Sequence, residues 1–466
     1  MRRYDCWCTK MEPASQAQVY KRRYPRSTSL WQLLNQHFNE FLERYDDLYQ
    51  SRYGFYRPVI NHVVQKYLEC GDLHQGFARI KCPDCQHEYL LAFSCRGRWF
   101  CPSCHNKKVV QFGHHLKETV LYPVPHRQYV FSIPKILRKF FLYDRKLLGK
   151  LSQCAAKSLS SFFRISLGNK YGIPGIVVAI QTFGDYVRWH PHLHALVADG
   201  LFLESGYFFV MPKVDLRPLR ELFRAHVLAM LKKEGLIDDT FIKMLMSWRH
   251  VSGFNIHNEV RISPGDGKGM ENLAQYIIRN TFSLEKLTFN QKSNSVLYRS
   301  KMTHGKNRKN FEVFSPLEFI AAITQHIPEQ SFQLVRYYGW YSNRMRGDRK
   351  RQQEPTEQDS TIQVTGSRVI EIKSYRPKRI PSLLWRACIK KVWEVDPLTC
   401  PKCSGEMRII SFIYQYQVIK KILKHLKIYE EKRQRAPPTK KAAIKEVEIV
   451  SYDDGWPGYK EAVFEP

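Results

Sequence analysis

The chain has 466 residues, more than one hydrophobic core usually serves, so two or three domains are expected. Lysine and arginine number 74 against 43 aspartate and glutamate residues, a net charge of +31 that favours a polyanionic partner. No run of about 18 apolar residues and no basic-then-apolar leader occurs, so we expect nucleic acid rather than a membrane as that partner.

Five regions are expected along the chain. Residues 1–29 form a basic tail without sustained periodicity. Residues 30–108 begin with apolar residues at helical spacing, which predicts two helices, and end in a cysteine-rich segment. Residues 109–346 alternate β-rich runs with helical stretches, which predicts an α+β domain. Residues 347–380 are charged and poor in large apolar groups, as in a linker, and residues 381–466 form a small C-terminal unit.

Twelve cysteines are present, and six of them lie in close succession between Cys70 and Cys104, as metal ligands do in a reducing, cytoplasmic compartment. Two Cys-x-x-Cys pairs in this segment are separated by fifteen residues: Cys82, Cys85, Cys101 and Cys104. This spacing predicts one closed, four-thiolate structural zinc site, against the alternative of free thiols or disulfides.

Other potential zinc ligands lie nearby in the sequence. Cys70, His87, Cys95 and His105 could substitute for one of the four cysteines or make a second site. The C-terminal pair Cys400 and Cys403 supplies half a zinc site, with Cys388 as a possible third ligand, and is equally compatible with an unmetallated turn.

Cations and aromatic side chains surround the second cysteine pair, and such a surface can grip phosphates and stack bases. The alternative is a solvated charged face with aromatic core residues. The candidate DNA-binding cations here are Arg96, Arg98, Lys107 and Lys108.

The run Trp189-His-Pro-His-Leu-His-Ala-Leu-Val197 predicts a β-strand. Alternate side chains of a strand share one face, so His192 and His194 point the same way and can chelate one divalent cation. The alternative is a pair of hydrogen-bonded strand histidines. His190 would occupy an edge position because of the adjacent proline.

A preceding strand at residues 176–182 is expected to pair antiparallel with the histidine strand. Gln181 would then reach the metal from across the ladder, with Asp185 as a competing oxygen donor. Either residue is also compatible with an ordinary turn or ladder role.

The segment Leu334-Val-Arg-Tyr-Tyr-Gly-Trp-Tyr-Ser-Asn-Arg-Met-Arg346 contains three tyrosines. If it is helical, Tyr337 and Tyr341 lie one turn apart and face one side. A phenol attacks a phosphate only with help from a metal and cations, which Arg336, Arg344 and Arg346 could supply. The alternatives are an aromatic packing stripe, or Tyr338 as the nucleophile.

These motifs resemble those of a known family. His192-Leu-His194 resembles the HUH motif, and residues 336–343 resemble the tyrosine motif of two-tyrosine transposases of the insertion-sequence ninety-one type. Residues 93–104, 130–134, 181–185 and 325–328 are also similar to that family. The resemblance covers residues 30–345 and the C-terminal Cys-Pro-Lys-Cys. It implies an HUH endonuclease core, an antiparallel sheet with flanking helices, preceded by a small zinc-binding domain.

The resemblance also implies a rolling-circle-like reaction. His192 and His194, with Gln181 as an expected third ligand, would hold Mg²⁺ or Mn²⁺, and Tyr337 and Tyr341 would be the nucleophiles. One DNA strand, single-stranded or hairpin at the element end, would be nicked to give a 5′-phosphotyrosine and a free 3′ hydroxyl. We expect this to occur at the bacterial nucleoid, without a membrane partner.

Two other functions are compatible with the sequence alone. A plasmid or phage replication initiator, or a relaxase-like nickase, would share the core chemistry. A non-catalytic, zinc-dependent DNA-binding regulator would need neither the tyrosines nor the histidine pair.

Overall fold

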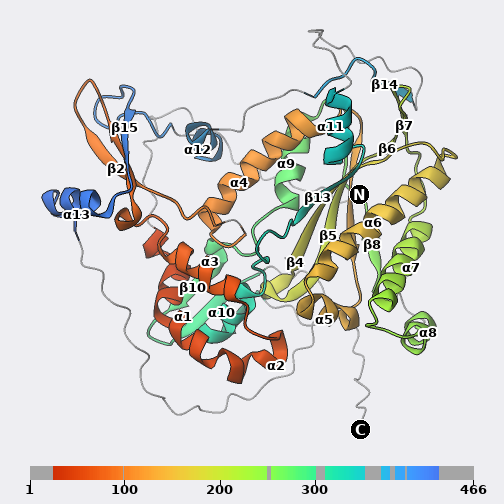
Figure 1. The fold of residues 1–466 in the computed structure, drawn as a ribbon, viewed down its shortest axis with the longest axis horizontal. Coiled ribbons are helices and arrows are strands. Elements are labelled where there is room, and N and C mark those ends of the chain that lie inside the picture. The colour runs from red at the N-terminus through yellow and green to blue at the C-terminus, as the bar shows by residue number, and fades with distance from the viewer. Residues whose placement is uncertain are drawn as a thin grey trace. The chain divides into compact units, whose positions relative to one another are not determined.

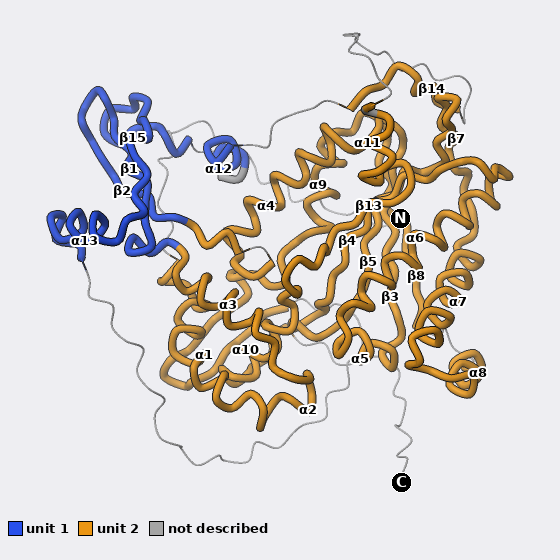
Figure 2. The backbone as a smooth tube through the Cα atoms, viewed as in Figure 1, with its two compact units in different colours: residues 1–23, 71–93, 383–429 blue, residues 24–70, 94–382, 430–466 orange. Residues whose placement is uncertain are grey.

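The computed structural model describes residues 25–97, 99–248, 253–300, 310–351, 369–377, 384–393 and 396–429 (Figure 1). These residues fall into two compact units (Figure 2). Unit 1 is built from residues 71–93 and 383–429, and unit 2 from residues 24–70 and 94–382. Among the described helices, none is long and apolar enough to cross a membrane.

The centre of unit 2 is a six-stranded sheet in which every described pairing is antiparallel. Its path follows the order β13, β4, β5, β3 and β8, with β9 also pairing with β3. The strands are β3 (His126–Ser132), β4 (Gly175–Phe183), β5 (Trp189–Ala198), β8 (Asn255–His257), β9 (Arg261–Ile262) and β13 (Val335–Gly339).

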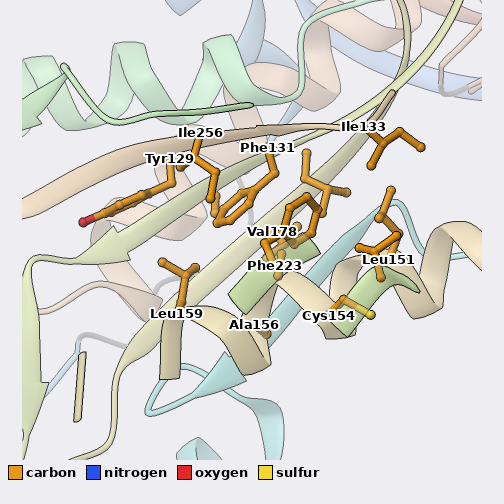
Figure 3. Packing of buried hydrophobic residues seen from close by; sticks show 14 of the residues in the cluster. Tyr129, Phe131, Ile133, Leu151, Cys154, Ala156, Leu159, Val178, Phe223 and Ile256 are labelled. Atoms are coloured by element: carbon orange, nitrogen blue, oxygen red, sulfur yellow. The ribbon is translucent and has the colours of Figure 1, made fainter. Parts of the chain in front are cut away.

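Three helices cover one face of this sheet: α5 (Lys135–Tyr143), α6 (Lys146–Ser166) and α7 (Arg217–Lys233). Side chains alternate along β4 and β5, so Val178, Leu193 and Ala195 turn toward these helices. Figure 3 shows part of this core, where Phe131 of β3 packs edge to face on Phe223 of α7 with ring centroids 4.9 Å apart. Helix α8 (Asp239–Ser247) adds Leu245 to the same core.

The opposite face packs against α4 (Pro102–His115), the π-helical turn Leu116–Val120 and α9 (Gly267–Ile277). The strand residues on this side are the ones between those of the first face, including Val177, Ala179 and Leu196. A second sheet, in the order β14, β7, β6, adjoins this core through β6 and β7. Its strands are β6 (Gly200–Phe202), β7 (Tyr207–Val210) and β14 (Val369–Glu371).

A further core in unit 2 joins helices from distant parts of the sequence to a small sheet. The two helices expected in residues 30–68 are confirmed as α1 (Ser29–Leu48) and α3 (Pro58–Leu68), joined by the short α2 (Gln50–Tyr53). They pack with α10 (Pro316–Thr324), which begins in a Ser315–Glu318 capping box. The sheet of this core consists of β10 (Leu287–Asn290), β11 (Ser295–Arg299) and β12 (Phe311–Phe314).

Unit 1 contains a three-stranded antiparallel sheet in the order β15, β1, β2. Two of its strands, β1 (Phe77–Lys81) and β2 (Glu88–Ala92), come from the N-terminal segment, and β15 (Arg408–Ile413) comes from the C-terminal one. Helices α12 (Trp385–Trp393) and α13 (Tyr416–His425) complete it. The structure therefore partitions the expected regions differently. Residues 71–93 join the C-terminal segment, while α1 and α3 belong to unit 2.

The α+β class is confirmed, but the predicted tyrosine helix is wrong. Residues 335–339 form strand β13, which pairs antiparallel with β4, and helix α11 (Asn343–Arg351) begins only after the tyrosines. Gly339 ends the strand in a left-handed conformation, with φ of +56°. Trp340 then donates its backbone N–H to the carbonyl of Pro174, at 2.9 Å. A valine-and-tyrosine run with a buried partner strand adopts the extended form, and the glycine stops helical continuation.

Gly339→Ala should destabilise the protein, because an added Cβ would lie 1.9 Å from the backbone oxygen of Pro174. The left-handed backbone alone costs a residue with a Cβ about 1–2 kcal/mol, and this clash adds to that cost. Chemical denaturation measures the change in unfolding free energy. Gly347→Ala in α11 is the control, because its Cβ meets open space and should be neutral or stabilising by about 0.5–1 kcal/mol. Equal effects of both substitutions would contradict this account of Gly339.

Candidate active site

Two histidines of β5 lie side by side on the sheet face that α9 covers. Leu193 and Ala195 turn into the opposite core, so His192 and His194 share the other face, with ring centroids 5.0 Å apart. The expected antiparallel pairing of β4 with β5 is confirmed, with Gln181 directly opposite His192 and Ala179 opposite His194. The small side chain of Ala179 leaves room beside His194.

Three buried side-chain atoms here have no hydrogen-bond partner within the described structure: Nε2 of His194, Oε1 of Gln181 and Nε2 of His190. Gln181 is oriented by its amide nitrogen, which donates to the carbonyl of Ile277 at 2.8 Å and leaves the oxygen unpaired. An unpaired buried polar atom costs about 1–3 kcal/mol, so such a cluster fits residues that hold a cation.

Hydrogen bonds hold both imidazoles from behind. Nδ1–H of His192 donates to the carbonyl of His190 at 2.8 Å, so Nε2 of His192 offers its lone pair. The amide nitrogen of Gln128 is placed 2.8 Å from Nδ1 of His194. The amide nitrogen and oxygen of glutamine are interchangeable in shape, so the side chain of Gln128 can also be turned by half a rotation. Its oxygen then accepts a hydrogen bond from Nδ1–H of His194, and Nε2 of His194 is left as the ligand atom.

Burial keeps these imidazoles neutral. Desolvation is the main cause that lowers the pKa of His192 to about 4, of His190 to about 3 and of His194 to about 2. Arg279 contributes to the lowering of the pKa at His192 and His194. Neutral imidazole is the form that binds metal ions, so the site does not depend on deprotonation at neutral pH.

The tyrosines of β13 point to opposite faces of the sheet. Tyr337 is opposite Val177 and packs on the face that carries His192, His194 and Gln181. Tyr338 is opposite Ile176 and packs against the α6 side, where its hydroxyl lies 2.8 Å from Oγ of Ser152.

Tyr341 is fully buried, with 0% of its surface exposed. Its hydroxyl donates to Nε2 of His126 at 2.8 Å, because Nδ1–H of His126 is already donated to the carbonyl of Val124. The backbone N–H of Tyr122 donates to the same hydroxyl at 3.4 Å. Burial raises the pKa of Tyr341 well above its ordinary value. Tyr341 therefore packs in the same core as Tyr337, but its hydroxyl is buried and hydrogen-bonded.

The three arginines expected beside the nucleophile lie in different places. Arg336 lies beside α6, where a Cβ on Gly149 would come within 2.8 Å of its guanidinium, so it accompanies Tyr338. Arg344 is exposed, with its Nε 3.9 Å from Asp348 on the same helix. Arg346 alone of the three accompanies Tyr337, with its guanidinium carbon 6.0 Å from the ring centroid. Strand alternation places Arg336 on the side of Tyr338, whereas Arg344 and Arg346 belong to helix α11.

Two residues of this site were missed in the sequence. Arg279 is exposed just after α9, with its guanidinium 5.0 Å from the ring of Tyr276, which in turn packs edge-on against His194 at 5.6 Å. Gln128 belongs to β3, the other neighbour of β5. Neither stands in a recognisable motif, and only the pairing register brings them to the histidines.

The turn between β4 and β5 is strained and well supported. Tyr186 and Val187 adopt left-handed φ values of 53° and 59°, which a valine rarely does. His326 holds this turn, since its Nε2–H donates to the carbonyl of Val187 at 2.8 Å. The ring of Trp189 stacks on His326 at 5.8 Å and carries the guanidinium of Arg145 at 4.7 Å. The start of β5 is thereby fixed.

The competing oxygen donor, Asp185, is exposed in the same turn and accepts a hydrogen bond from Oγ of Ser300 at 3.2 Å. Among the expected DNA-binding cations, Arg96 is exposed and Lys107 and Lys108 are half-buried, all three in unit 2. Arg98 lies outside the described residues.

The predicted single zinc quartet is wrong, because the two Cys-x-x-Cys pairs separate into different units. Cys101 and Cys104 group with Cys70 and Cys95 in unit 2. Sγ of Cys104 lies 3.9 Å from that of Cys70 and 3.6 Å from that of Cys95, close to the edge of about 3.8 Å in a tetrahedral zinc–thiolate site. His105 is not a ligand, since its Nε2 contacts the carbonyl of Ile278 at 2.6 Å and its Nδ1 accepts from the backbone N–H of Trp99.

The second quartet contains Cys82 and Cys85 together with Cys400 and Cys403, all in unit 1. Cys388 belongs to neither group, although it is buried. Sequence spacing alone favoured ligands that are close along the chain. The sheet of unit 1 instead brings the distant pair to Cys82 and Cys85.

Two family models match the chain. Residues 175–349 match a family described as "Putative transposase", and residues 34–133 match one described as "Transposase zinc-binding domain". The first range contains the histidine strand, Gln181 and the tyrosines. The second contains the quartet around Cys101 but stops well before Cys400.

Two curated relatives were also found. The "Transposase for insertion sequence element IS801" of Pseudomonas savastanoi pv. phaseolicola is 26% identical over 368 residues, covering 76% of this chain and 84% of the relative. The "Putative transposase y4qJ" of Sinorhizobium fredii is 23% identical over 332 residues, covering 66% of this chain and 80% of the relative. No solved structure matches.

Tyr341→Phe should lower the free energy of unfolding by about 1–3 kcal/mol, since it strips the buried Nε2 of His126 of its hydrogen-bond donor. Urea denaturation of the full chain measures the loss. Tyr171→Phe is the control, because Tyr171 is 76% exposed and its change should be near zero. If the two variants unfold at the same urea concentration, the hydroxyl of Tyr341 is not part of the core.

Proposed function

We propose that this chain, which matches two transposase family models and is similar to a transposase of an insertion sequence, nicks and rejoins single-stranded DNA at element ends through a phosphotyrosine at Tyr337. The observation that carries the proposal is that the tyrosine and the candidate metal ligands share one face of the sheet. Tyr337 lies on the same sheet face as His192, His194 and Gln181, and two of those three residues have unpaired buried ligand atoms.

His192, His194 and Gln181 are the residues that would hold the catalytic ion. The amide oxygen of Gln181 is a ligand type that suits Mg²⁺ and Mn²⁺. Because all three residues are neutral, a bound ion would keep its full charge to polarise the scissile phosphate. Gln128 and the carbonyl of His190 orient the two rings for this task.

Tyr337 then attacks the phosphorus. The bond from its Oη to phosphorus forms as the bond to the 3′ oxygen breaks, so the 5′ phosphate stays on the tyrosine and a 3′ hydroxyl is released. Burial raises the pKa of Tyr337, while Arg346 lowers it and favours the developing phenolate. The bond energy is kept in the ester, so joining to a new 3′ hydroxyl requires no nucleotide cofactor.

A single nucleophile fits this site better than two. The Tyr341 hydroxyl is buried and engaged with His126, and Tyr338 faces the α6 side. We therefore assign the second attack to a DNA 3′ hydroxyl rather than to Tyr341. Tyr341 instead fixes the end of β13 against the core.

We assign Arg279, near the histidines, and Arg346, near Tyr337, to binding of the DNA backbone. Arg279 contributes positive potential at His192 and His194, and Arg346 does so at Tyr337. Phosphate contacts of this kind fix the position of a strand without reading its sequence. The strong positive charge of the chain supports the same mode of binding.

Tyr337→Phe should abolish the covalent adduct between the protein and a single-stranded oligonucleotide carrying an element end. The assay incubates the protein with Mn²⁺ and a 3′-labelled oligonucleotide and detects label on denaturing gels. Tyr338→Phe is the matched control and should retain the adduct, because its hydroxyl faces the other side of the sheet. Loss of the adduct in the control alone would move the nucleophile to Tyr338, and absence of nicking by the unmodified protein would favour a non-catalytic DNA-binding regulator.

Gln128→Leu should raise the Mn²⁺ concentration that gives half-maximal nicking by about 10–100-fold, since it removes the hydrogen bond that orients His194. Saturating Mn²⁺ should restore most of the rate, which separates metal binding from misfolding. An unchanged Mn²⁺ dependence would remove Gln128 from the site.

A further inference from the structure

Unit 1 contains two copies of one turn, at residues 82–86 and 400–404. In each, the backbone N–H of the fifth residue donates to the carbonyl of the first, from Gln86 to Cys82 at 3.1 Å and from Ser404 to Cys400 at 2.9 Å. Gln86 and Ser404 both adopt a left-handed φ of 61°. Two segments distant in the sequence thus fold into the same knuckle, which points both cysteines of a pair in one direction.

The four sulfur atoms of these turns converge. Sγ of Cys82 lies 3.5 Å from that of Cys403, and Sγ of Cys85 lies 3.5 Å from that of Cys400. All four ligand atoms lie within 4.8 Å of one another. These separations far exceed the disulfide bond length of about 2.0 Å and approach the edge of about 3.8 Å in a tetrahedral zinc site.

The apolar cores of unit 1 are too small to hold two chain segments together. One consists of Phe77, Leu90, Ile419 and Leu423, with a few partly buried neighbours. The other is built around Ile80 and Met407, and its remaining fully buried members are Cys82 and Cys400 themselves. Small units of this kind depend on a metal or on disulfides for their stability.

The three-stranded sheet of unit 1 also depends on the link between the two cysteine turns. Strand β1 leads directly into Cys82, and it pairs with β2 on one side and with β15, which follows Cys403, on the other. The pairing with β15 has a register shift between Arg79 and Ile80. Without a link between the knuckles, β15 would be held by five cross-strand pairs and few apolar contacts.

We propose that Cys82, Cys85, Cys400 and Cys403 bind a second structural zinc ion, which fastens the C-terminal segment to the N-terminal one and makes unit 1 a split zinc ribbon. Four thiolates close the coordination sphere, so the ion is structural rather than catalytic. The proposal concerns unit 1 alone and does not depend on the nicking reaction. Cys400 and Cys403 lie outside both matched family ranges.

Elemental mass spectrometry of the purified full chain tests the proposal by measuring the number of zinc ions per chain. The unmodified protein should contain two zinc ions, and the double variants Cys82→Ser/Cys85→Ser and Cys400→Ser/Cys403→Ser should each contain one. The quadruple variant should also contain one, because both pairs serve the same ion. Cys388→Ser is the control, with two ions expected, since Cys388 belongs to neither quartet.

Two outcomes would overturn the proposal. One is an unchanged zinc content after Cys400→Ser/Cys403→Ser, and the other is a greater loss in the quadruple variant than in either double variant. A measurement on the unmodified chain covers the case in which variants fail to fold. Titration with a thiol-blocking mercurial should release two zinc ions to a chromogenic chelator, and release of only one would exclude the second site.

Discussion

The candidate active site depends on the alternation of side chains along β5. Leu193 and Ala195 fill the core under α6, and this anchoring obliges His192 and His194 to point into the opposite face. A slip of one residue would turn the imidazoles into the core under α6 and Leu193 and Ala195 toward α9, so the same apolar contacts that stabilise the sheet also set the positions of the candidate metal ligands. The two strands beside β5 supply Gln181 from β4 and Gln128 from β3, and β13, on the other side of β4, supplies Tyr337.

Much of this arrangement follows from local patterns in the sequence. The His-Leu-His run in an apolar strand predicts two imidazoles on one face, and the short turn after residue 183 predicts the pairing that brings Gln181 opposite His192. The α+β class follows equally from the alternation of strand-like and helical runs. Such features depend on residues close in the chain, where side-chain periodicity and turn chemistry decide the outcome.

Other features depend on distant partners that no local pattern identifies. Tyr337 and Tyr341 stand at helical spacing in the sequence, but pairing with β4 and the turn at Gly339 make residues 335–339 a strand, which places Tyr337 and Tyr338 on opposite faces. The cysteine pairs were equally ambiguous, because each Cys-x-x-Cys supplies two ligands and any two pairs can complete a site. Sheet pairing, rather than proximity in sequence, selects Cys400 and Cys403 for Cys82 and Cys85.

The pairing of Cys82 and Cys85 with Cys400 and Cys403 has a consequence for the order in which the ribosome makes the chain. Cys400 is made 315 residues after Cys85, when all strands of the six-stranded sheet of unit 2 have been synthesised. Until then the first knuckle has only half of its ligands. A polypeptide that ends before Cys400 would therefore contain every strand of the six-stranded sheet of unit 2 but only two of the four cysteines of the unit 1 quartet.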